Sequence, residues 1–381
     1  MKTKQIDYVV LIIVIALALF GVLMVFSATF YTEQVKASSG LDSAIKQGIL
    51  ATTGMLIMLS ISYVPFRTYN RFRIRGNPVI PIFVALISAG LLLYCILVGI
   101  IEGRGINGAQ RWLTIFGISV QPSEIGRFAV LLFVADDLAH KKQDIPGCKN
   151  IIELVKLLFP SFLITGIISL LIIAGRSMSM CMTTLFLFAC LLSAAGVKWQ
   201  HLGIFAIIGG VAAVAMVFME DYRVARVLIF RDPWRDTQGD GYQLIQSLYA
   251  LANGGLFGVG PGNSRQKLSY LTYGESDFIL SIIGEEYGFI GVLILLAAFA
   301  LLVFRGYRIA NYQSDAFGSF LAVGVTSTIW LQLVIHCLVV TSSMPPTGVP
   351  LPFISAGGTS MWIFMAQTGI LLNISRYNRL L

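Results

Sequence analysis

Long apolar runs recur along the whole chain, and they are the feature that most limits how it can fold. A helix needs about 20 apolar residues to cross the hydrocarbon layer of a membrane, and a shorter run requires extension or a local adjustment. Runs of this character lie near residues 8–28, 48–64, 79–101, 125–139, 157–174, 180–196, 201–219, 278–304, 317–341 and 358–374. We therefore predict an all-α polytopic integral membrane protein with about ten transmembrane helices, in which residues 1–381 form a single membrane domain.

Composition excludes several other classes of protein. Only 12% of the 381 residues are charged and 56% are hydrophobic, whereas soluble domains carry roughly 25% charged residues. Disordered, collagen-like and nucleic-acid-binding chains are excluded on this ground, so no nucleic-acid partner is expected. The five cysteines form no CxxC pair and the three histidines are far apart in sequence, so neither predicts a metal cluster.

The net charge of +8 is explained by loop cations that orient the helices. With the N-terminus in the cytoplasm, the cytoplasmic loops and ends receive fifteen cations: Lys2, Lys4, Arg67, Arg71, Arg73, Arg75, Lys141, Lys142, Lys149, Lys156, Lys198, Arg305, Arg308, Arg376 and Arg379. The opposite short loops receive five: Lys36, Lys46, Arg104, Arg111 and Arg176. Because cytoplasmic loops carry an excess of Lys and Arg, both termini are predicted to be cytoplasmic.

The longest hydrophilic stretch, residues 220–276, follows the seventh run and is predicted to be a large extracytoplasmic loop between spans 7 and 8. Within it, residues 242–256 have the apolar spacing of an amphipathic helix, so we expect an ordered external cap. A glycine-rich segment follows at residues 254–264. It lacks the Lys-Ser/Thr ending of a P-loop, and either a turn approached closely by a ligand or a hinge fits it better.

Asp277 stands at the predicted outer mouth of the eighth span, in the string SDFI. A carboxylate that is partly desolvated at the membrane interface can have a raised pKa and serve as a general base. The alternative is a helix N-cap, because Asp is favoured directly before an apolar helical run. The two roles do not exclude each other.

Glu285 and Glu286 lie about two turns into the same span. Ionisable residues inside a bilayer are costly and face a cavity or a partner. Helical spacing puts Glu285 near the face of Asp277, which predicts a carboxylate-lined cleft that opens outward. The alternative is a structural pair with Arg127 or another buried cation.

The fourth span begins with Gln121, Pro122, Ser123 and Glu124, which is typical of a helix start. Arg127 follows one turn later, and Glu124 is its nearest candidate counter-charge. Arg111 and Trp112 precede this span on the outer side. Trp112 is either a membrane anchor or one wall of a site for a sugar or diphosphate, whose oxygens Arg111 would bind.

Proline and glycine are concentrated at residues 344–360, in the string MPPTGVPLPFISAGGTS. Near an outer membrane edge, this composition suggests a re-entrant or broken helix that lines a cavity.

Taken together, these strings resemble the SEDS family of shape, elongation, division and sporulation proteins, which includes FtsW, RodA and SpoVE. The resemblance covers nearly the whole chain and rests on the ordered series GAQRWL, QPSE, GDGYQLIQSL, GNSRQKL, SDFI and PPTGVPLPFISAGGTS. The string GNSRQKL is more similar to the FtsW and SpoVE branch than to RodA. The resemblance implies ten spans and a peptidoglycan glycosyltransferase that polymerises lipid II outside the bacterial cytoplasmic membrane.

The resemblance also implies roles for individual residues. Asp277 matches the family's essential aspartate, proposed as the catalytic base, and Trp112 matches a functionally sensitive tryptophan. Further motif positions that are candidate substrate-binding residues are Arg111, Gln121, Ser123 and Glu124.

The chain also departs from the family pattern. At the fifth span it reads Gly175-Arg176-Ser177-Met178, and Ser177 takes the place of the usual acid or amide. Tyr273 replaces a familiar Glu. The other departures are Arg127 for Lys, Ala356 for Tyr and His336 near a usual Asn.

The reaction implied is an inverting glycosyl transfer from an undecaprenyl-diphosphate-linked donor, with Asp277 as the base. Arg111, Arg265 and Lys267 are candidates to stabilise the leaving group, assisted by a divalent cation such as Mg²⁺ or Mn²⁺. Expected partners are lipid II, a class B penicillin-binding protein that acts as transpeptidase, and other division proteins. The alternatives are a lipid II flippase and a non-catalytic division scaffold.

Overall fold

The computed structural model describes residues 5–35, 41–74, 76–102, 111–115, 118–219, 221–239, 241–268 and 270–377. Several residues used above lie outside these ranges. They are the loop cations Lys2, Lys4, Lys36, Arg75, Arg104 and Arg379, and the first three residues of the string GAQRWL.

Each of the ten apolar runs forms a helix. In chain order these helices are α1 (Tyr8–Val35), α2 (Asp42–Tyr63), α4 (Val79–Glu102), α5 (Pro122–Lys141), α7 (Phe159–Ala174), α8 (Met178–Ala194), α9 (Trp199–Phe218), α12 (Ile279–Asn311), α13 (Ala316–Val340) and α14 (Gly358–Ser375). The short helices are α3 (Thr68–Arg71), α6 (Ile151–Leu157), α10 (Asp221–Arg231) and α11 (Tyr242–Gly254), with 3₁₀ turns at Ile145–Gly147 and Pro233–Asp236.

By length and composition, six helices among the described residues are suited to cross a membrane: α1, α2, α4, α9, α12 and α13. The pair α6 and α7, bent by 82°, raises this number to seven if it counts as one span. The expected number of about ten spans is therefore not confirmed, although the protein is a polytopic helical membrane protein. The main reason is chemical, since α5 carries Glu124, Arg127, Asp136 and Asp137 and α8 has only 17 residues.

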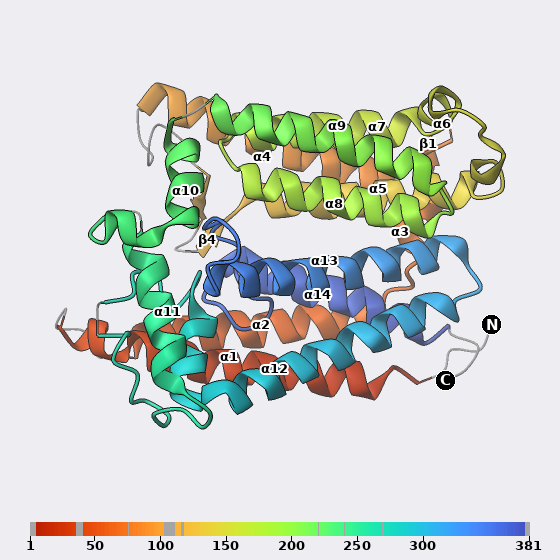
Figure 1. The fold of residues 1–381 in the computed structure, drawn as a ribbon. Helices are drawn as coiled ribbons and strands as arrows, with labels where there is room; N and C mark the ends of the chain where they lie inside the picture. The colour runs from red at the N-terminus through yellow and green to blue at the C-terminus, as the bar shows by residue number, and fades with distance from the viewer. Residues whose placement is uncertain are drawn as a thin grey trace.

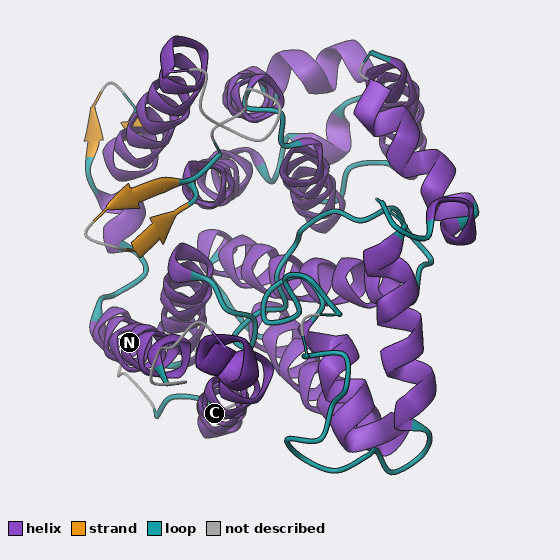
Figure 2. Ribbon diagram, turned by 90° about the vertical axis from the view of Figure 1, so that its left-hand side faces the viewer, coloured by secondary structure: helices purple, strands orange, loops and turns teal. Residues whose placement is uncertain are grey.

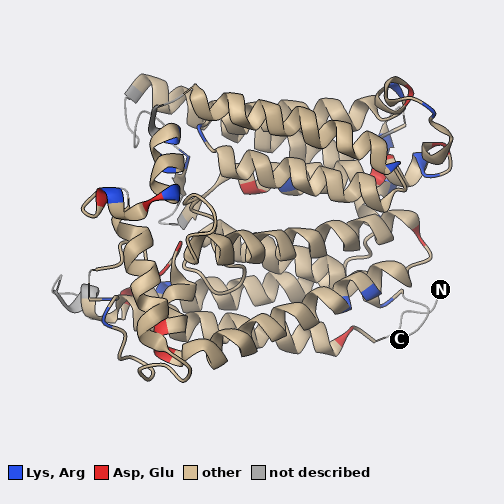
Figure 3. Cartoon of the chain, in the orientation of Figure 1, with Lys and Arg blue, Asp and Glu red and all other residues tan. Residues whose placement is uncertain are grey.

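The long helices run side by side in two groups (Figure 1). One group contains α4, α5, α7, α8 and α9, and the other contains α1, α2, α12, α13 and α14. The two chain ends meet at one end of the bundle, where the N–H of Asp7 donates to the hydroxyl of Ser375 at 3.0 Å. Charged residues gather toward the two ends, and the middle of the bundle holds few of them (Figure 3).

The opposite end of the bundle is covered by α10 and α11, which run across the long helices (Figures 1 and 2). The predicted amphipathic helix is confirmed as α11, whose buried side includes Leu244 and Ile245. A small antiparallel hairpin of β3 (Leu113–Ile115) and β4 (Ile118–Val120) precedes α5 at this end, with Thr114 paired to Ser119. A second hairpin, β1 (Arg73–Ile74) and β2 (Asn77–Pro78), follows α3.

Helix α12 is broken at Gly288, whose φ of 66° and ψ of −170° are not helical. At this break, the glycine-rich segment after α11 forms hydrogen bonds with backbone groups of α12 on both sides of Gly288. Carbonyls of Glu285 and Glu286 accept from Val259 and Gly260, and the N–H groups of Phe289 and Ile290 donate to Gly255 and Leu256. Unpaired backbone groups are costly inside a membrane. The glycine-rich segment therefore has a structural role, which is to satisfy the backbone groups of α12 around Gly288.

Candidate active site

A cavity of about 1070 Å³ lies at the end of the bundle that carries α10 and α11. Its walls come from the first turns of α2, α8, α11 and α14, from β4, and from the segments before α12 and α14. The charged residues in the lining are Lys46, Arg111, Arg176, Arg226, Glu275 and Asp277. Pockets for small molecules range from roughly 300 to 1,000 Å³, so this cavity has room for a ligand at the large end of that range.

Asp277 lines the cavity and lies two residues before α12 begins. The N-cap of α12 is Phe278, and no side chain caps this helix. The N–H of Asp277 donates to the carbonyl of Tyr273 at 3.1 Å, within a turn. The N-cap alternative is therefore wrong, because the helix starts one residue later than that role requires.

The proline-rich segment before α14 holds the backbone on the N-terminal side of Asp277. The N–H of Ala356 donates to the carbonyl of Glu275 at 2.9 Å. The buried hydroxyl of Ser355 donates to the carbonyl of Ser276 at 2.6 Å. The segment lines the cavity as predicted, but it consists of turns and irregular backbone rather than a re-entrant or broken helix. Its polar groups fix the position of Asp277.

Gly348 leaves the space that the Asp277 carboxylate occupies. A Cβ atom built on Gly348 would lie 3.3 Å from Oδ2 of Asp277. The φ of Gly348 is 65°, in the left-handed region that side chains with a Cβ disfavour. Glycine at this position therefore satisfies both the turn and the close approach of the carboxylate.

Burial raises the pKa of the Asp277 carboxyl group to about 6. A hydrogen bond from Ser276 and the charge of Arg226 act in the opposite direction, while the charge of Glu275 raises this pKa further. A carboxylate with a pKa close to the working pH can both accept and return a proton. Asp277 therefore has the properties of a general base that faces a ligand-sized cavity.

The rest of the cavity is electropositive. Four cations line it against two carboxylates. Among the described helices, α2, α8, α11 and α14 place residues of their first turns in its walls, and the N-cap residues of α5 and α12 also line it. Helix N-termini carry partial positive charge and expose N–H donors. The cavity is thus suited to an anionic ligand.

Three predicted binding residues, Arg111, Trp112 and Gln121, lie in the cavity lining. Arg111 donates from Nη2 to the carbonyl of Arg176, and Trp112 is 41% exposed. The N–H of Gln121 donates to the hydroxyl of Thr359 at 2.9 Å, which joins the start of α5 to the start of α14. All three therefore lie where a cavity ligand could contact them, and their roles in binding stay predictions.

Ser123 and Glu124 lie behind the lining rather than in it. Glu124 is fully buried and accepts a hydrogen bond of 2.6 Å from Ser360, which does line the cavity. Through this contact Glu124 orients a cavity residue without facing the cavity itself.

The predicted pair between Glu124 and Arg127 is not hydrogen-bonded. All three side-chain nitrogens of Arg127 are buried without a hydrogen-bond partner in the structure. Its guanidinium carbon lies 5.9 Å from the ring centroid of Phe364. The two groups still interact electrostatically, as their i and i+3 positions on one helix predict. Glu124 is thus the predicted counter-charge of Arg127, while one of its oxygens accepts the hydrogen bond from Ser360.

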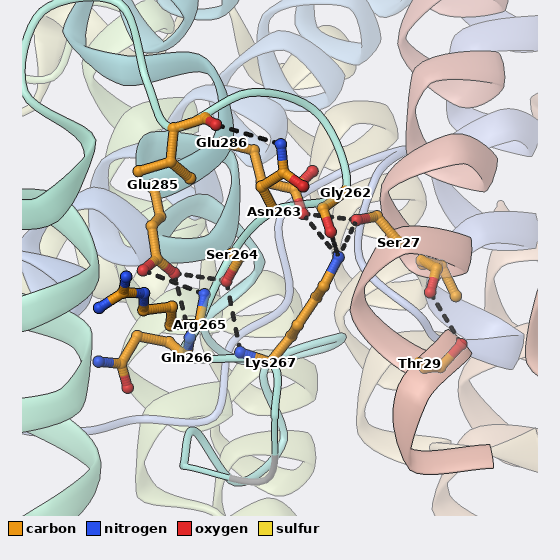
Figure 4. Close-up of polar contacts among 12 residues, drawn as sticks. Ser27, Thr29, Gly262, Asn263, Ser264, Arg265, Gln266, Lys267, Glu285 and Glu286 are labelled. Atoms are coloured by element: carbon orange, nitrogen blue, oxygen red, sulfur yellow. Dashed lines mark hydrogen bonds and ion pairs between the residues drawn. The ribbon is translucent and has the colours of Figure 1, made fainter. Parts of the chain in front are cut away.

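Glu285, Glu286, Arg265 and Lys267 lie together in a separate polar cluster, shown in Figure 4. The carboxylate of Glu285 accepts from the hydroxyl of Ser264 and from the N–H groups of Arg265 and Gln266, the last two at 3.3 and 3.2 Å. It also accepts a longer hydrogen bond of 3.4 Å from Asn253.

The carboxylate of Glu286 in this cluster pairs with Lys267 at 3.2 Å and accepts from Ser27 at 2.6 Å. None of the four predicted residues lines the cavity, and the Arg265 side chain is exposed to solvent. The expected cleft shared by Glu285 and Asp277 is therefore wrong, because Asp277 is not on the helix and helical phase does not relate the two. The structural-pair alternative is the better one, with Lys267 rather than Arg127 as partner.

Three cations and one hydroxyl of the site were not predicted as binding residues: Lys46, Arg176, Arg226 and Ser355. The sequence assigned Lys46 and Arg176 to the predicted outer short loops, and Arg226 lies in the predicted external loop of residues 220–276. Their common signal was a predicted position outside the cytoplasm, where membrane orientation does not demand cations.

The described residues contain no group of three or more His, Cys, Asp or Glu side chains that could hold a metal ion. The cavity offers Glu275 and Asp277 as carboxylates. Magnesium binds in many proteins through one or two carboxylates together with substrate phosphates. A divalent cation would fit here only in that manner.

Comparison with known proteins decides the family. Residues 7–380 match the sequence profile of the FtsW/RodA/SpoVE family, described as a cell cycle protein. This chain belongs to that family. It is 35% identical over 374 residues to a protein of Geobacter sp. strain M18 named probable peptidoglycan glycosyltransferase FtsW, covering 98% of each chain. It is also 35% identical over 385 residues to stage V sporulation protein E of Bacillus subtilis strain 168, covering 100% of each.

Solved structures share the fold. A chain from the structure described as "Structural coordination of polymerization and crosslinking by a peptidoglycan synthase complex" matches with a TM-score of 0.71 and 24% identity. The match covers 97% of this chain and 98% of that one. RodA of Thermus thermophilus matches with a TM-score of 0.68 and 22% identity over 98% of both chains.

Departures from the FtsW/RodA/SpoVE pattern concentrate in the cavity. Ser177, Tyr273 and Ala356 all lie in its lining. Arg127 and His336 do not line it. Three of the five departures that the resemblance identifies therefore lie in the lining of the cavity that Asp277 faces.

Proposed function

We propose that this protein is a peptidoglycan glycosyltransferase that polymerises lipid II into β-1,4-linked glycan strands during division or related wall synthesis. The observation that carries the proposal is the position of Asp277. A carboxylate with a raised pKa faces an electropositive cavity large enough for a sugar diphosphate, in a chain of this family. Relatives named peptidoglycan glycosyltransferases support the choice of reaction.

The proposed step uses Asp277 as the base. Its carboxylate takes the proton from the C4 hydroxyl of the acceptor GlcNAc as that oxygen attacks the anomeric carbon of the donor MurNAc. The bond from this carbon to the phosphate oxygen breaks, the configuration inverts from α to β, and undecaprenyl diphosphate leaves as an anion. Cations in the lining stabilise the charge that develops on the leaving group.

The proposed leaving-group cations differ from those predicted. Arg111 remains a candidate because it lines the cavity, and Arg176, Arg226 and Lys46 join it. Arg265 and Lys267 are not part of the proposal, since one is exposed outside the cavity and the other is paired with Glu286.

We include a divalent cation, Mg²⁺ or Mn²⁺, in the proposal. The substrate diphosphate would be its main ligand, and Glu275 is the protein group that would help to hold it. When bound, such an ion would neutralise diphosphate charge. The proton transfer to Asp277 does not depend on it.

The protein is a multi-pass membrane protein, and we propose that its cavity faces out of the cytoplasm. Supporting this side, the cavity lies at the end of the bundle opposite the chain termini (Figure 1), and the loop cations predict cytoplasmic termini. Lipid II would then reach the cavity from the outer leaflet, and strands would form outside the membrane.

A class B penicillin-binding protein is the proposed partner, since glycan strands must be cross-linked by a transpeptidase. Support comes from the fold shared with a chain of a peptidoglycan synthase complex. Other division proteins are expected as further partners.

The flippase alternative has less support from the structure. It requires charged groups along a path through both leaflets, and Asp136 and Asp137 were its candidates near the inner side. Asp136 is bound by Arg73 at 2.5 Å, and Asp137 is bound by Lys141 at 2.5 Å. Both carboxylates are therefore engaged at the far end of the bundle. The scaffold alternative is disfavoured because the Asp277 environment is intact.

The test is polymerisation of labelled lipid II by the purified protein, with and without its transpeptidase and with Mg²⁺ or Mn²⁺. Lipid II transport across vesicles is measured on the same preparation. We expect glycan strands and no transport. Transport without strands would favour a flippase, and neither activity would favour a scaffold.

A further inference from the structure

The start of α8 has an unusual backbone conformation. Arg176, which directly precedes the N-cap residue Ser177, has a φ of 58°. This left-handed conformation is uncommon for a residue other than glycine. The residue before the N-cap is therefore turned sharply, and both Arg176 and Ser177 line the cavity.

The Ser177 hydroxyl is available to a ligand. Serine at an N-cap ordinarily accepts a hydrogen bond from the backbone two or three residues later, but Ser177 makes no such bond. Ser177 is 92% buried, with 8% of its surface exposed, and its hydroxyl has no hydrogen-bond partner among the residues that the structure describes. The resemblance to the family predicts an acid or amide here. Compared with an ionised acid, which can only accept, the Ser177 hydroxyl can donate to an anion.

Positive charge converges on the same point. Arg111 comes from the segment before β3 and donates from Nη2 to the carbonyl of Arg176, which fixes its guanidinium beside the start of α8. The 17-residue α8 adds its N-terminal N–H groups.

This cluster is connected to the surroundings of Asp277 through residues 347 and 348 of the cavity wall. The Ser179 hydroxyl, in the first turn of α8, donates to the carbonyl of Thr347 at 3.0 Å. The next residue, Gly348, is the one whose Cβ position lies 3.3 Å from the Asp277 carboxylate. The start of α8 and the base are therefore joined through two consecutive residues of one cavity wall.

We propose that Arg176, Ser177 and Arg111 form a diphosphate subsite at the start of α8, which binds the diphosphate of the lipid-linked donor and holds it as it leaves. The inference rests on the proposed function and adds a specific site for the leaving group. Arg176 is the member of this subsite that contributes a positive charge from the start of α8 itself, and it lines the cavity beside Ser177.

The test is binding of undecaprenyl diphosphate to the purified full-length protein in nanodiscs, with undecaprenol as the probe that lacks phosphate. We expect Arg176→Gln to weaken binding of the diphosphate on the order of tenfold or more, because a charge-assisted contact is lost. Arg176→Lys should bind within a few-fold of wild type, and Ser177→Ala should lose less than Arg176→Gln. Undecaprenol should bind all variants equally.

The matched control is Arg235→Gln, which removes the same charge from an exposed residue outside the cavity lining. Its diphosphate binding should equal that of wild type. If Arg176→Gln and Ser177→Ala both bind undecaprenyl diphosphate as wild type does, the subsite is wrong. Thermal melting checks folding, and if Arg176→Gln is unfolded, Ser177→Ala and Arg176→Lys decide.

Failure of the subsite and failure of the function give different results. Wild-type polymerisation that depends on Asp277, together with unchanged diphosphate binding in the variants, overturns only the subsite. Wild-type protein that neither polymerises lipid II nor binds undecaprenyl diphosphate overturns both. If the subsite is correct, undecaprenyl diphosphate should also inhibit polymerisation by Arg176→Gln more weakly than it inhibits the wild type.

Discussion

Two sets of carboxylates lie close together in sequence around the start of α12, and they are held in opposite ways. Asp277 faces a cavity, and burial raises its pKa to about 6. Glu285 and Glu286 are more deeply buried but are bound by N–H groups, hydroxyls and the Lys267 ammonium. Burial alone therefore does not identify a catalytic acid. The useful distinction is whether neighbouring donors already occupy the carboxylate.

Substitution of Asp277 should have the largest effect on activity, because it is the only one of these three carboxylates that faces the cavity. Asp277→Asn removes the proton acceptor and keeps the side-chain shape, so kcat should fall by about 10²–10⁴-fold. The thermal unfolding temperature should be retained or rise at pH 8, where wild type carries a desolvated ionised carboxylate. Because the folded pKa is raised, any such gain should shrink as the pH falls below about 6. A large loss of melting temperature would indicate a structural role instead.

The second prediction concerns the buried ion pair. Lys267→Met leaves the carboxylate of Glu286, which is 1% exposed, with Ser27 as its remaining hydroxyl donor. Breaking a buried pair from one side costs about 3–5 kcal/mol, so the melting temperature should fall strongly. The double variant Lys267→Met/Glu286→Gln should recover part of it. Arg265→Met is the matched control, since this side chain is exposed and the expected change is under about 0.5 kcal/mol.

Gly348→Ala should disturb the base without removing it. The substitution introduces strain of about 1–2 kcal/mol at positive φ and places a Cβ beside Oδ2 of Asp277. We expect kcat to fall on the order of tenfold through misplacement of the carboxylate. Gly196→Ala carries similar strain, with a φ of 85° and nothing within 4 Å, and its kcat should remain that of wild type. Equal losses in both variants would contradict the positioning argument.

The smallest effects are shifts in the pH profile of kcat. Activity should rise with pH and reach half its plateau near pH 6, because the base must be deprotonated. Arg226→Gln removes a charge that lowers the pKa of Asp277, so the midpoint should move to higher pH. Glu275→Gln removes a charge that raises it, so the midpoint should move to lower pH. Shifts in the same direction would contradict the assigned causes.

Much of the fold could be predicted from the sequence because apolar runs and helical period are local properties. All ten runs form helices, and the amphipathic pattern before Leu256 forms α11. The number of spans could not be predicted in the same way. Helix α5 carries charged residues whose partners lie in other elements of the fold, so its own composition does not decide whether it crosses the membrane. The contacts of Glu124 and Asp136 with Ser360 and Arg73 join distant segments of the chain.

The site was predicted in part. Asp277, Arg111, Trp112 and Gln121 lie in the cavity lining as expected. The prediction that Glu285 shares a cleft with Asp277 was wrong. It took both residues to lie on one continuous helix, whereas α12 begins at Ile279. The contacts of the glycine-rich segment with α12 depend on tertiary packing, which local spacing does not contain.

The central claim is that Asp277, and neither buried glutamate, supplies the base. The measurement that tests it most directly is lipid II polymerisation by Asp277→Asn and Glu285→Gln side by side, each normalised to the folded fraction. The account predicts no glycan strands from Asp277→Asn, and strands from Glu285→Gln at a rate that follows the amount of folded protein. Strands from Asp277→Asn, with none from folded Glu285→Gln, would contradict it.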